Sequence, residues 1–276
     1  MLEKFSRSWT LVKASADVLR SDKELLVFPL LSGLAAMLVV ATFIIPVFAL
    51  KIFESGMGVG GAILGFLFYL CQYFVIFFFN AALVGAAIIR LEGGDPTLAD
   101  GFNAAKSRLG PILGYAAIAA TVGLLLQALK NKQSNFLVRM IGSGLGVAWT
   151  LSTFLVVPVL VQQNIGPIDA IKESVKLLKR TWGENAIGNV GLGLAFGLMM
   201  FGVIMVGLLL AFVSAQVSGA LAITIIVITV LAAVALGVVQ SALSAIYSAA
   251  LYRFATVGEA PQGFEAIGLQ SAFTPK

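Results

Sequence analysis

Two long stretches of this chain contain no charged residue. One lies between Glu54 and Arg90, and the other lies between Glu184 and Arg253. A helix needs roughly 20 apolar residues to cross a bilayer, so the first stretch has room for one long span and the second for two. Over the whole chain 59% of residues are hydrophobic and 11% are charged, whereas soluble domains carry about 25% charged residues. These properties predict an integral membrane protein.

The apolar runs predict an all-α fold in which about six transmembrane helices form three hairpins. We expect one transmembrane domain, residues 1–276, with spans at about 27–50, 59–90, 110–130, 136–163, 186–213 and 219–252. The second and sixth runs exceed the bilayer requirement by about ten residues, at 1.5 Å of rise per residue. They should therefore tilt, kink or project into the cytoplasm. The first run is longer than the apolar core of a secretory signal, which predicts a retained span.

The basic residues are distributed unevenly between the two sides of this arrangement. Of the 18 lysines and arginines, only Lys51, Lys130, Lys132 and Arg139 fall on one side, which leaves fourteen on the other. Basic residues favour the cytoplasmic side of a membrane protein. This asymmetry predicts that both termini are cytoplasmic.

Three segments on the basic side have helical periodicity, at about 3–22, 96–108 and 167–182. In the third, Ile168, Ile171, Val175, Leu178 and Trp182 form an apolar stripe beside basic residues. Such a helix can lie in the membrane interface with its lysine heads at the phosphates, which is the reading we favour. Alternatively, the stripes pack on the ends of neighbouring helices. The candidate contacts with anionic lipid or the interface are Arg7, Trp9, Lys13, Lys172, Lys176, Lys179, Arg180 and Trp182.

The same order of elements recurs along the chain. An amphipathic helix followed by a hairpin occupies about 3–90, 95–163 and 167–253, and proline lies in each short elbow. Asp95 in the first elbow is a candidate helix N-cap. Parallel repeats of this kind occur in transporters, so we interpret the pattern as a threefold internal repeat.

Groups that normally carry chemistry are missing from the predicted spans. The chain has no histidine, and Cys71 is its single cysteine, which argues against zinc sites and excludes an internal disulfide. No acidic residue lies well inside a span, which argues against a proton relay. We therefore expect no catalytic residue, no metal site and no cofactor.

Several uncharged polar residues do fall within the spans, and the candidate intramembrane contacts among them are Gln72, Asn80, Asn189 and Gln240. They either line a polar path or form interhelical hydrogen bonds, each worth roughly 0.6–2 kcal/mol in membranes, and we favour the bonds. Glycine pairs four residues apart predict close helix packing, within the chain by default or alternatively between copies. These pairs are Gly61/Gly65, Gly110/Gly114, Gly142/Gly146 and Gly193/Gly197.

Two blocks of sequence resemble a known family. The first runs from Phe5-Ser-Arg-Ser-Trp9 to Lys23-Glu-Leu-Leu-Val-Phe-Pro-Leu-Leu-Ser-Gly33, and the second contains Val156-Val-Pro-Val-Leu-Val161 and Ala170-Ile-Lys-Glu-Ser174. Both are similar to bacterial membrane proteins grouped as domain of unknown function 6159. The resemblance implies a bacterial inner-membrane location and supports six spans. It implies no activity and assigns no catalytic residue.

The favoured hypothesis is a non-enzymatic protein that organises the membrane by binding lipid or partner proteins through its basic helices. Anionic lipids are the expected partners, with a second copy or another membrane protein left open, and nucleic acid is not expected despite the net charge of +5. One alternative is a channel or uncoupled carrier for a small or apolar solute, which requires a cavity lined by the span amides. Another is an enzyme that acts on lipid headgroups at the cytoplasmic face.

Overall fold

The computed structural model describes residues 2–49, 58–131, 136–180, 182–258, 261 and 264. For 2–11, 48–49, 129–131, 136–143, 180, 182–192 and 194 it describes the backbone alone. In these ranges the chain forms helices joined by turns and short connections, and no strand occurs. Six helices are long and apolar enough to cross a membrane. The predicted all-α membrane fold is therefore confirmed.

A shorter helix precedes a pair of long helices three times along the chain. This is the order that the repeat hypothesis predicts, and common descent of the three units stays a prediction. The elements are α1 (Leu2–Ser21), η1 (Lys23–Leu26), α2 (Val27–Ala49), α4 (Val59–Leu91), α5 (Leu98–Lys106), α6 (Leu109–Asn131), α7 (Phe136–Ser152), α8 (Val156–Gln162), α9 (Pro167–Arg180), α10 (Trp182–Ala215) and α11 (Gly219–Val257).

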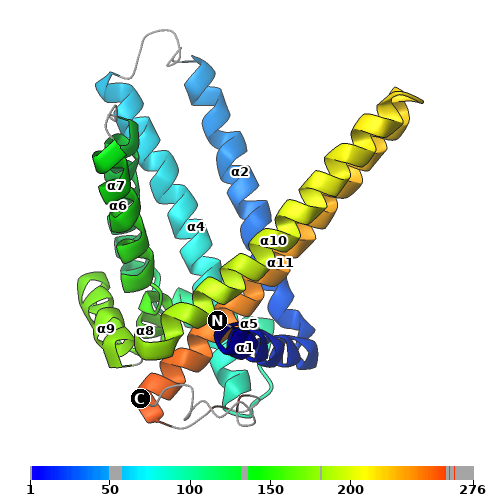
Figure 1. Cartoon of the computed structure of the whole chain (residues 1–276). Coiled ribbons are helices and arrows are strands. Elements are labelled where there is room, and N and C mark those ends of the chain that lie inside the picture. The colour runs from blue at the N-terminus through cyan, green and yellow to red at the C-terminus, as the bar shows by residue number, and fades with distance from the viewer. Residues whose placement is uncertain are drawn as a thin grey trace.

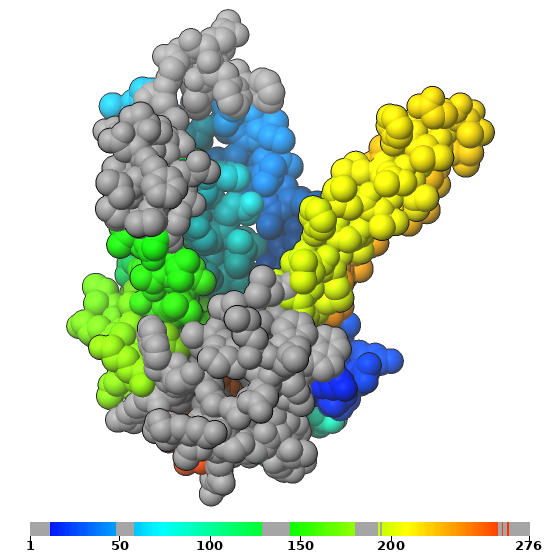
Figure 2. Space-filling view, viewed as in Figure 1, coloured from blue at the N-terminus to red at the C-terminus, as the bar shows by residue number. Residues whose placement is uncertain are grey.

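The long helices form two groups that meet at one end (Figure 1). Helices α2, α4, α6 and α7 run beside one another, while α10 and α11 pack along each other as a separate hairpin. We call the outer part of this hairpin, residues 195–236, the arm. Figure 2 shows the arm standing apart from α2 and α4 over its outer length. The fold is thus a V whose two limbs share one point of attachment.

The shorter helices gather where the limbs meet, and we call this region the base. It comprises α1, η1, α5, α8 and α9, the starts of α2 and α6, and the ends of α4 and α11. Residues 81–88 of α4 are buried there, as are nearly all residues from 242 to 252 of α11. Away from the base the long helices expose apolar side chains such as Leu38, Phe201 and Leu231. The protein-packed core therefore lies in the base, and the outer helix surfaces are suited to lipid.

The second and sixth predicted spans correspond to α4 and α11, and the residues beyond the length of one bilayer crossing form part of this core. Helix α4 has 33 residues and α11 has 39, and both end inside the base. At 1.5 Å of rise per residue, both helices are longer than a bilayer's hydrocarbon core is thick. Whether tilting, kinking or projection accommodates the excess stays a prediction. The two helices contact each other, and both contact α8.

The predicted span 136–163 is not one continuous helix. Helix α7 ends at Ser152 and α8 begins at Val156, with a short break at residues 153–155. Buried Ser174 of α9 bridges the break, because its hydroxyl donates to the Ser152 carbonyl (2.7 Å) and accepts from the Leu155 amide (3.1 Å). Backbone groups freed at membrane depth need such partners. A side chain remote in sequence thus stabilises the break.

Most of the described apolar residues of the amphipathic helices are buried or half-buried against protein. In α9 the buried residues are Ala170, Ser174, Leu177 and Leu178, whereas Ile168 is 60% exposed. Helix α1 packs across α10 and α11 and buries Val12, Ser15, Val18 and Leu19. This is the arrangement of the alternative reading, in which the stripes pack on neighbouring helices. The physical reason is that α4 and α11 extend past the bilayer and offer a surface to cover.

Helices approach closely at several glycines, but most of these are not the glycines that the sequence pattern predicted. A Cβ atom at Gly85 would overlap Ala104 of α5, one at Gly101 would overlap the Phe28 ring, and one at Gly207 would overlap Thr229. The prediction of close packing is wrong at Gly65, Gly110, Gly146, Gly193 and Gly197, where a Cβ would meet nothing within 4 Å. Gly114 does face a neighbour, because a Cβ atom added there would lie 2.9 Å from Pro167 Cγ.

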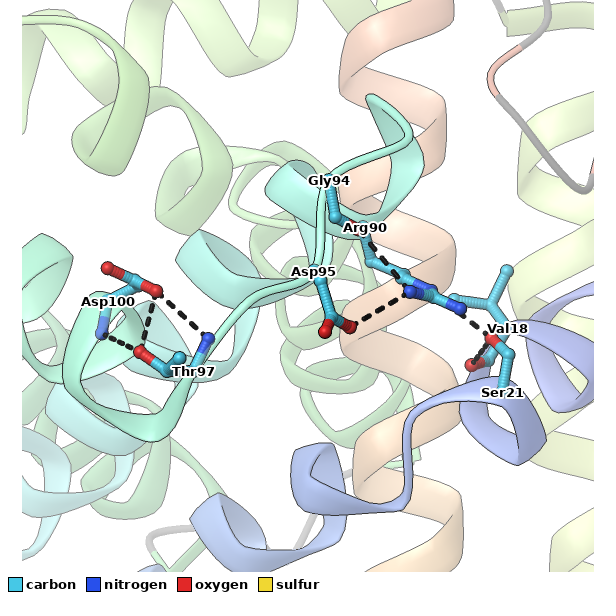
Figure 3. Close-up of polar contacts among 7 residues, drawn as sticks. All are labelled: Val18, Ser21, Arg90, Gly94, Asp95, Thr97 and Asp100. Atoms are coloured by element: carbon cyan, nitrogen blue, oxygen red, sulfur yellow. Dashed lines mark hydrogen bonds and ion pairs between the residues drawn. The ribbon is translucent and has the colours of Figure 1, made fainter.

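The elbow between α4 and α5 is held by Arg90 (Figure 3). Its guanidinium donates to the Ser21 hydroxyl at the end of α1 (3.3 Å) and to the Asp95 carboxylate (3.2 Å). The predicted N-cap role of Asp95 is wrong, because Thr97 caps α5 and forms a capping box with Asp100. Those hydrogen bonds hold the pKa of Asp100 below its ordinary value. Arg90 therefore ties three segments of the base together.

Asp22, between α1 and η1, is the buried acid of this region. The residue is 8% exposed, and the nearby Glu24 backbone amide acts to lower the pKa of its carboxyl. The carboxyl oxygen Oδ2 has no partner among the described residues. Burial raises the pKa of Asp22, although the nearby Arg90 opposes this. The carboxyl of Asp22 therefore holds its proton more tightly in the folded protein than in the unfolded chain.

Replacing Gly101 with valine should destabilise the base. The new side chain would collide with the Phe28 ring and the Ala82 carbonyl, and overpacking of this kind costs about 1–3 kcal/mol. Thermal unfolding in detergent should show a lower Tm for Gly101→Val. The matched Gly65→Val change on α4 meets open space and should leave Tm nearly unchanged; equal losses would contradict this account.

Replacing Asp22 with asparagine should stabilise the protein at neutral pH. With a raised folded-state pKa, the carboxyl binds its proton more tightly in the folded than in the unfolded chain. The free energy of unfolding therefore falls as the pH rises from the ordinary pKa of the unfolded chain to the raised pKa of the folded protein. Above the folded-state pKa the whole of this loss is present. Asparagine keeps the size of the side chain and removes the charge. The Tm of Asp22→Asn should exceed that of the parent at pH 7.5, and the gap should close below pH 4; a pH-independent gap would contradict the assignment.

Candidate functional site

A polar cavity lies where the two limbs meet. It has a volume of about 370 Å³ and lies between α4, the α7–α8 break and α11. We call it the vertex pocket. Gly237 and Ala245 line it together with two amides, three hydroxyls and one aromatic ring, from Asn80, Gln240, Ser241, Ser244, Ser248 and Phe154.

Local sequence explains why these groups converge. Residues 237, 241, 244 and 248 recur every three or four positions and so share one face of α11. Asn80 directly precedes the buried run of α4 that starts at Ala81. Phe154 lies in the break between α7 and α8, and its ring is 5.9 Å from that of buried Tyr247. The pocket therefore requires both the break and the crossing of α4 with α11.

The polar groups of the vertex pocket are largely unpaired within the protein. The Ser248 hydroxyl donates to the Ala245 carbonyl at 2.8 Å. Among the residues that the structure describes, no hydrogen bond engages the side chains of Asn80, Gln240, Ser241 or Ser244. Among the residues that the structure describes, no charged side chain lines the cavity. Unpaired polar groups are costly away from water, so the pocket is suited to an uncharged ligand that forms hydrogen bonds.

The depth of the pocket follows from helix length. Asn80 lies 21 residues after the first residue of α4, and Gln240 lies 21 residues after the first residue of α11. At 1.5 Å per residue both are about 31 Å from the far helix ends, which is close to the roughly 30 Å thickness of the hydrocarbon core. The pocket is therefore near one membrane interface. The packed turns of α4 and α11 lie beyond it, so it ends against the base.

A second candidate surface is the basic face of α9. Lys172, Lys176 and Lys179 are exposed, and with Val175 they line a shallow hollow of about 420 Å³. Lys172 pairs with Asp169 at 3.0 Å, and Lys176 pairs with Glu173 at 3.1 Å. These pairs lie within one exposed helix face, so they leave the lysines accessible to a phosphate.

The predicted site residues are divided between these surfaces. The structure brings Asn80 and Gln240 together, and it groups the three α9 lysines. Exposed Lys13 lies on α1, apart from α9. Gln72 is outside the pocket, with a buried Oε1 that lacks a partner among the described residues. The side chains of Arg7, Trp9, Arg180, Trp182 and Asn189 lie outside the described residues.

Sequence reasoning missed Phe154 and the three serines. The serine spacing after Gln240 was a usable signal, since it continues one face of the last span. Pro158 was a usable signal for the break that places Phe154, because proline cannot donate to the carbonyl of the residue four positions earlier. Another span amide behaves as the hydrogen-bonding interpretation predicts, because the Tyr69 hydroxyl of α4 donates to Gln127 of α6 at 3.1 Å.

Comparison with family models identifies one match, over residues 59–263, to a family of unknown function, DUF6159. The chain belongs to the DUF6159 family. The match begins at the first residue of α4 and includes the vertex pocket and α9. Of the two blocks that resemble the family, the second lies inside this range and the first precedes it. A comparison with curated proteins gave no match.

Proposed function

We propose that this family member is a non-enzymatic protein of the bacterial cytoplasmic membrane that binds anionic lipid through α9 and so organises lipid, or a partner protein, around its base. The observation that carries the proposal is the depth of the α9 lysines. Ser174 of α9 is hydrogen-bonded to both ends of the α7–α8 break, and Phe154 in that break lines the pocket. The lysines of α9 are therefore near the depth at which α4 and α11 have crossed one bilayer thickness.

The charges at this depth favour phosphate groups. Exposed ion pairs such as Lys172–Asp169 contribute about 0–1 kcal/mol, so a lipid phosphate can replace the carboxylate. Each lysine near an anionic membrane surface contributes about 1 kcal/mol to attraction. Three lysines on one face, with Ile171 and Val175 half-buried between them and the core, form a surface for lipid headgroups.

The carrier alternative retains one supporting observation, since Asn80 and Gln240 line the same cavity. The cavity ends against the packed turns of α4 and α11. We therefore favour binding over passage of a solute.

Neutralising the α9 lysines should weaken retention of anionic lipid. We expect the variant Lys172→Gln, Lys176→Gln, Lys179→Gln to retain at least about fivefold less phosphatidylglycerol than the parent, which corresponds to about 1 kcal/mol. Native mass spectrometry of detergent-purified protein measures the bound lipid. The control variant Arg20→Gln, Lys23→Gln, Lys106→Gln removes the same charge from exposed positions on α1, η1 and α5. Equal loss in both variants, or no loss in the first, would reject the α9 surface.

The excess of basic residues on one side also predicts orientation. Alkaline phosphatase fused after Lys276 should be inactive in bacteria, and phosphatase fused after Val217, in the turn between α10 and α11, should be active. A fluorescent protein that matures only in the cytoplasm should show the opposite pattern. The reverse result would move the base, and the α9 lysines with it, to the outer side.

A further inference from the structure

We propose that the vertex pocket binds an uncharged, hydroxyl-rich head group, that of a glycolipid or of a free sugar or polyol. This inference is based on the pocket alone and does not depend on the lipid-binding role of α9.

The lining matches that chemistry. Each amide of Asn80 and Gln240 offers both an acceptor and donors, and each serine hydroxyl does the same. Sugar and polyol hydroxyls also donate and accept, so they can satisfy these side chains from either direction. A phosphate or carboxylate would need a positive partner in a site near the hydrocarbon core, and no positive side chain of the described part of the chain lines the pocket.

The shape of the pocket points in the same direction. Its volume of about 370 Å³ is at the small end of the range for ligand sites, so it suits a head group and not whole acyl chains. Phe154 supplies an apolar wall for the C–H face of a sugar ring. Its position is set by the break that Ser174 bridges and by packing near Tyr247.

One face of α11 continues from the pocket onto the arm. Ile226, Val230 and Ala233 precede Gly237, Ser241 and Ser244 at spacings of three or four residues, so this face changes from apolar to polar toward the base. The apolar part lines a groove between α10 and α11 of about 430 Å³, with a polar contribution only from Thr229. An amphiphile could place its head in the pocket and an acyl chain along this groove. This continuity favours a glycolipid over a free sugar.

Gly237 allows the pocket to be filled with little risk to folding. A Cβ at this position would meet nothing within 4 Å, and leucine has a higher helix propensity than glycine. Gly202 on α10 has the same open surroundings and lies outside the pocket, so Gly202→Leu is a matched control. Gln240→Leu removes one amide and provides a second, independent variant, with Gln127→Leu as its control.

The test compares three probes on full-length protein in a polyoxyethylene detergent, which carries no sugar. The probes are monoglucosyl diacylglycerol, phosphatidylglycerol with the same acyl chains, and free glucose as a competitor, and native mass spectrometry measures the bound lipid. We expect Gly237→Leu and Gln240→Leu to retain glucosyl lipid at least about tenfold less than their controls. Retention of phosphatidylglycerol, which the α9 lysines would hold, should not change.

Equal retention of glucosyl lipid in the pocket variants and their controls would overturn the proposal. A loss of phosphatidylglycerol alone in Gly237→Leu would also overturn it, because the pocket would then take a charged head. If free glucose displaces the glucosyl lipid at millimolar concentration, the head group binds on its own and a soluble ligand is supported. If free glucose does not displace the lipid, the groove between α10 and α11 contributes to binding through the acyl chain, and a glycolipid is supported. The α9 triple variant should retain glucosyl lipid normally, which separates this proposal from the proposed function.

Discussion

The packing of the last turns of α4 holds the rest of this structure together. Its residues 81–88 contain alanine and glycine at the points where neighbours approach most closely. The missing side chain at Gly85 admits Ala104, and the Ala82 carbonyl lies against Gly101. Helices α5, α8 and α11 contact this segment. Larger residues would push α5 away, and the arm, the break and the elbow would lose their common support.

This concentration of packing in the base reflects the solvent around each part. In lipid, apolar side chains gain little by contacting each other, because the acyl chains are equally apolar. Outside the bilayer, burial of apolar surface is strongly favourable. The chain accordingly buries its core around the parts of α4 and α11 that exceed the length needed to span a bilayer. The arm can diverge from α2 and α4 because lipid can cover its exposed leucines and valines.

The divergence also explains why polar groups lie at the vertex. Two limbs that meet at an angle cannot pack evenly at the junction, and the resulting space is lined by Asn80, Gln240 and the serines of α11. At the same depth α7 is interrupted, with Ser174 satisfying the free backbone groups. Polar side chains without protein partners persist near a membrane interface when water or a ligand satisfies them. The vertex pocket and the basic face of α9 are thus at one level of the molecule and differ in charge.

The sequence by itself determined the membrane class, the number of long apolar helices and the side on which basic residues concentrate, because these depend on composition and on the fixed rise of a helix. It also identified Asn80 and Gln240 as polar residues in spans, and Lys172 and Lys176 as basic residues beside an apolar stripe. Only the tertiary structure decided that the two amides share one cavity, that α7 and α8 are separate helices, and that the buried side of α9 is centred on Ser174 and Leu177. Those outcomes depend on which helix faces meet, and contacts between residues 160 positions apart have no signature in local periodicity.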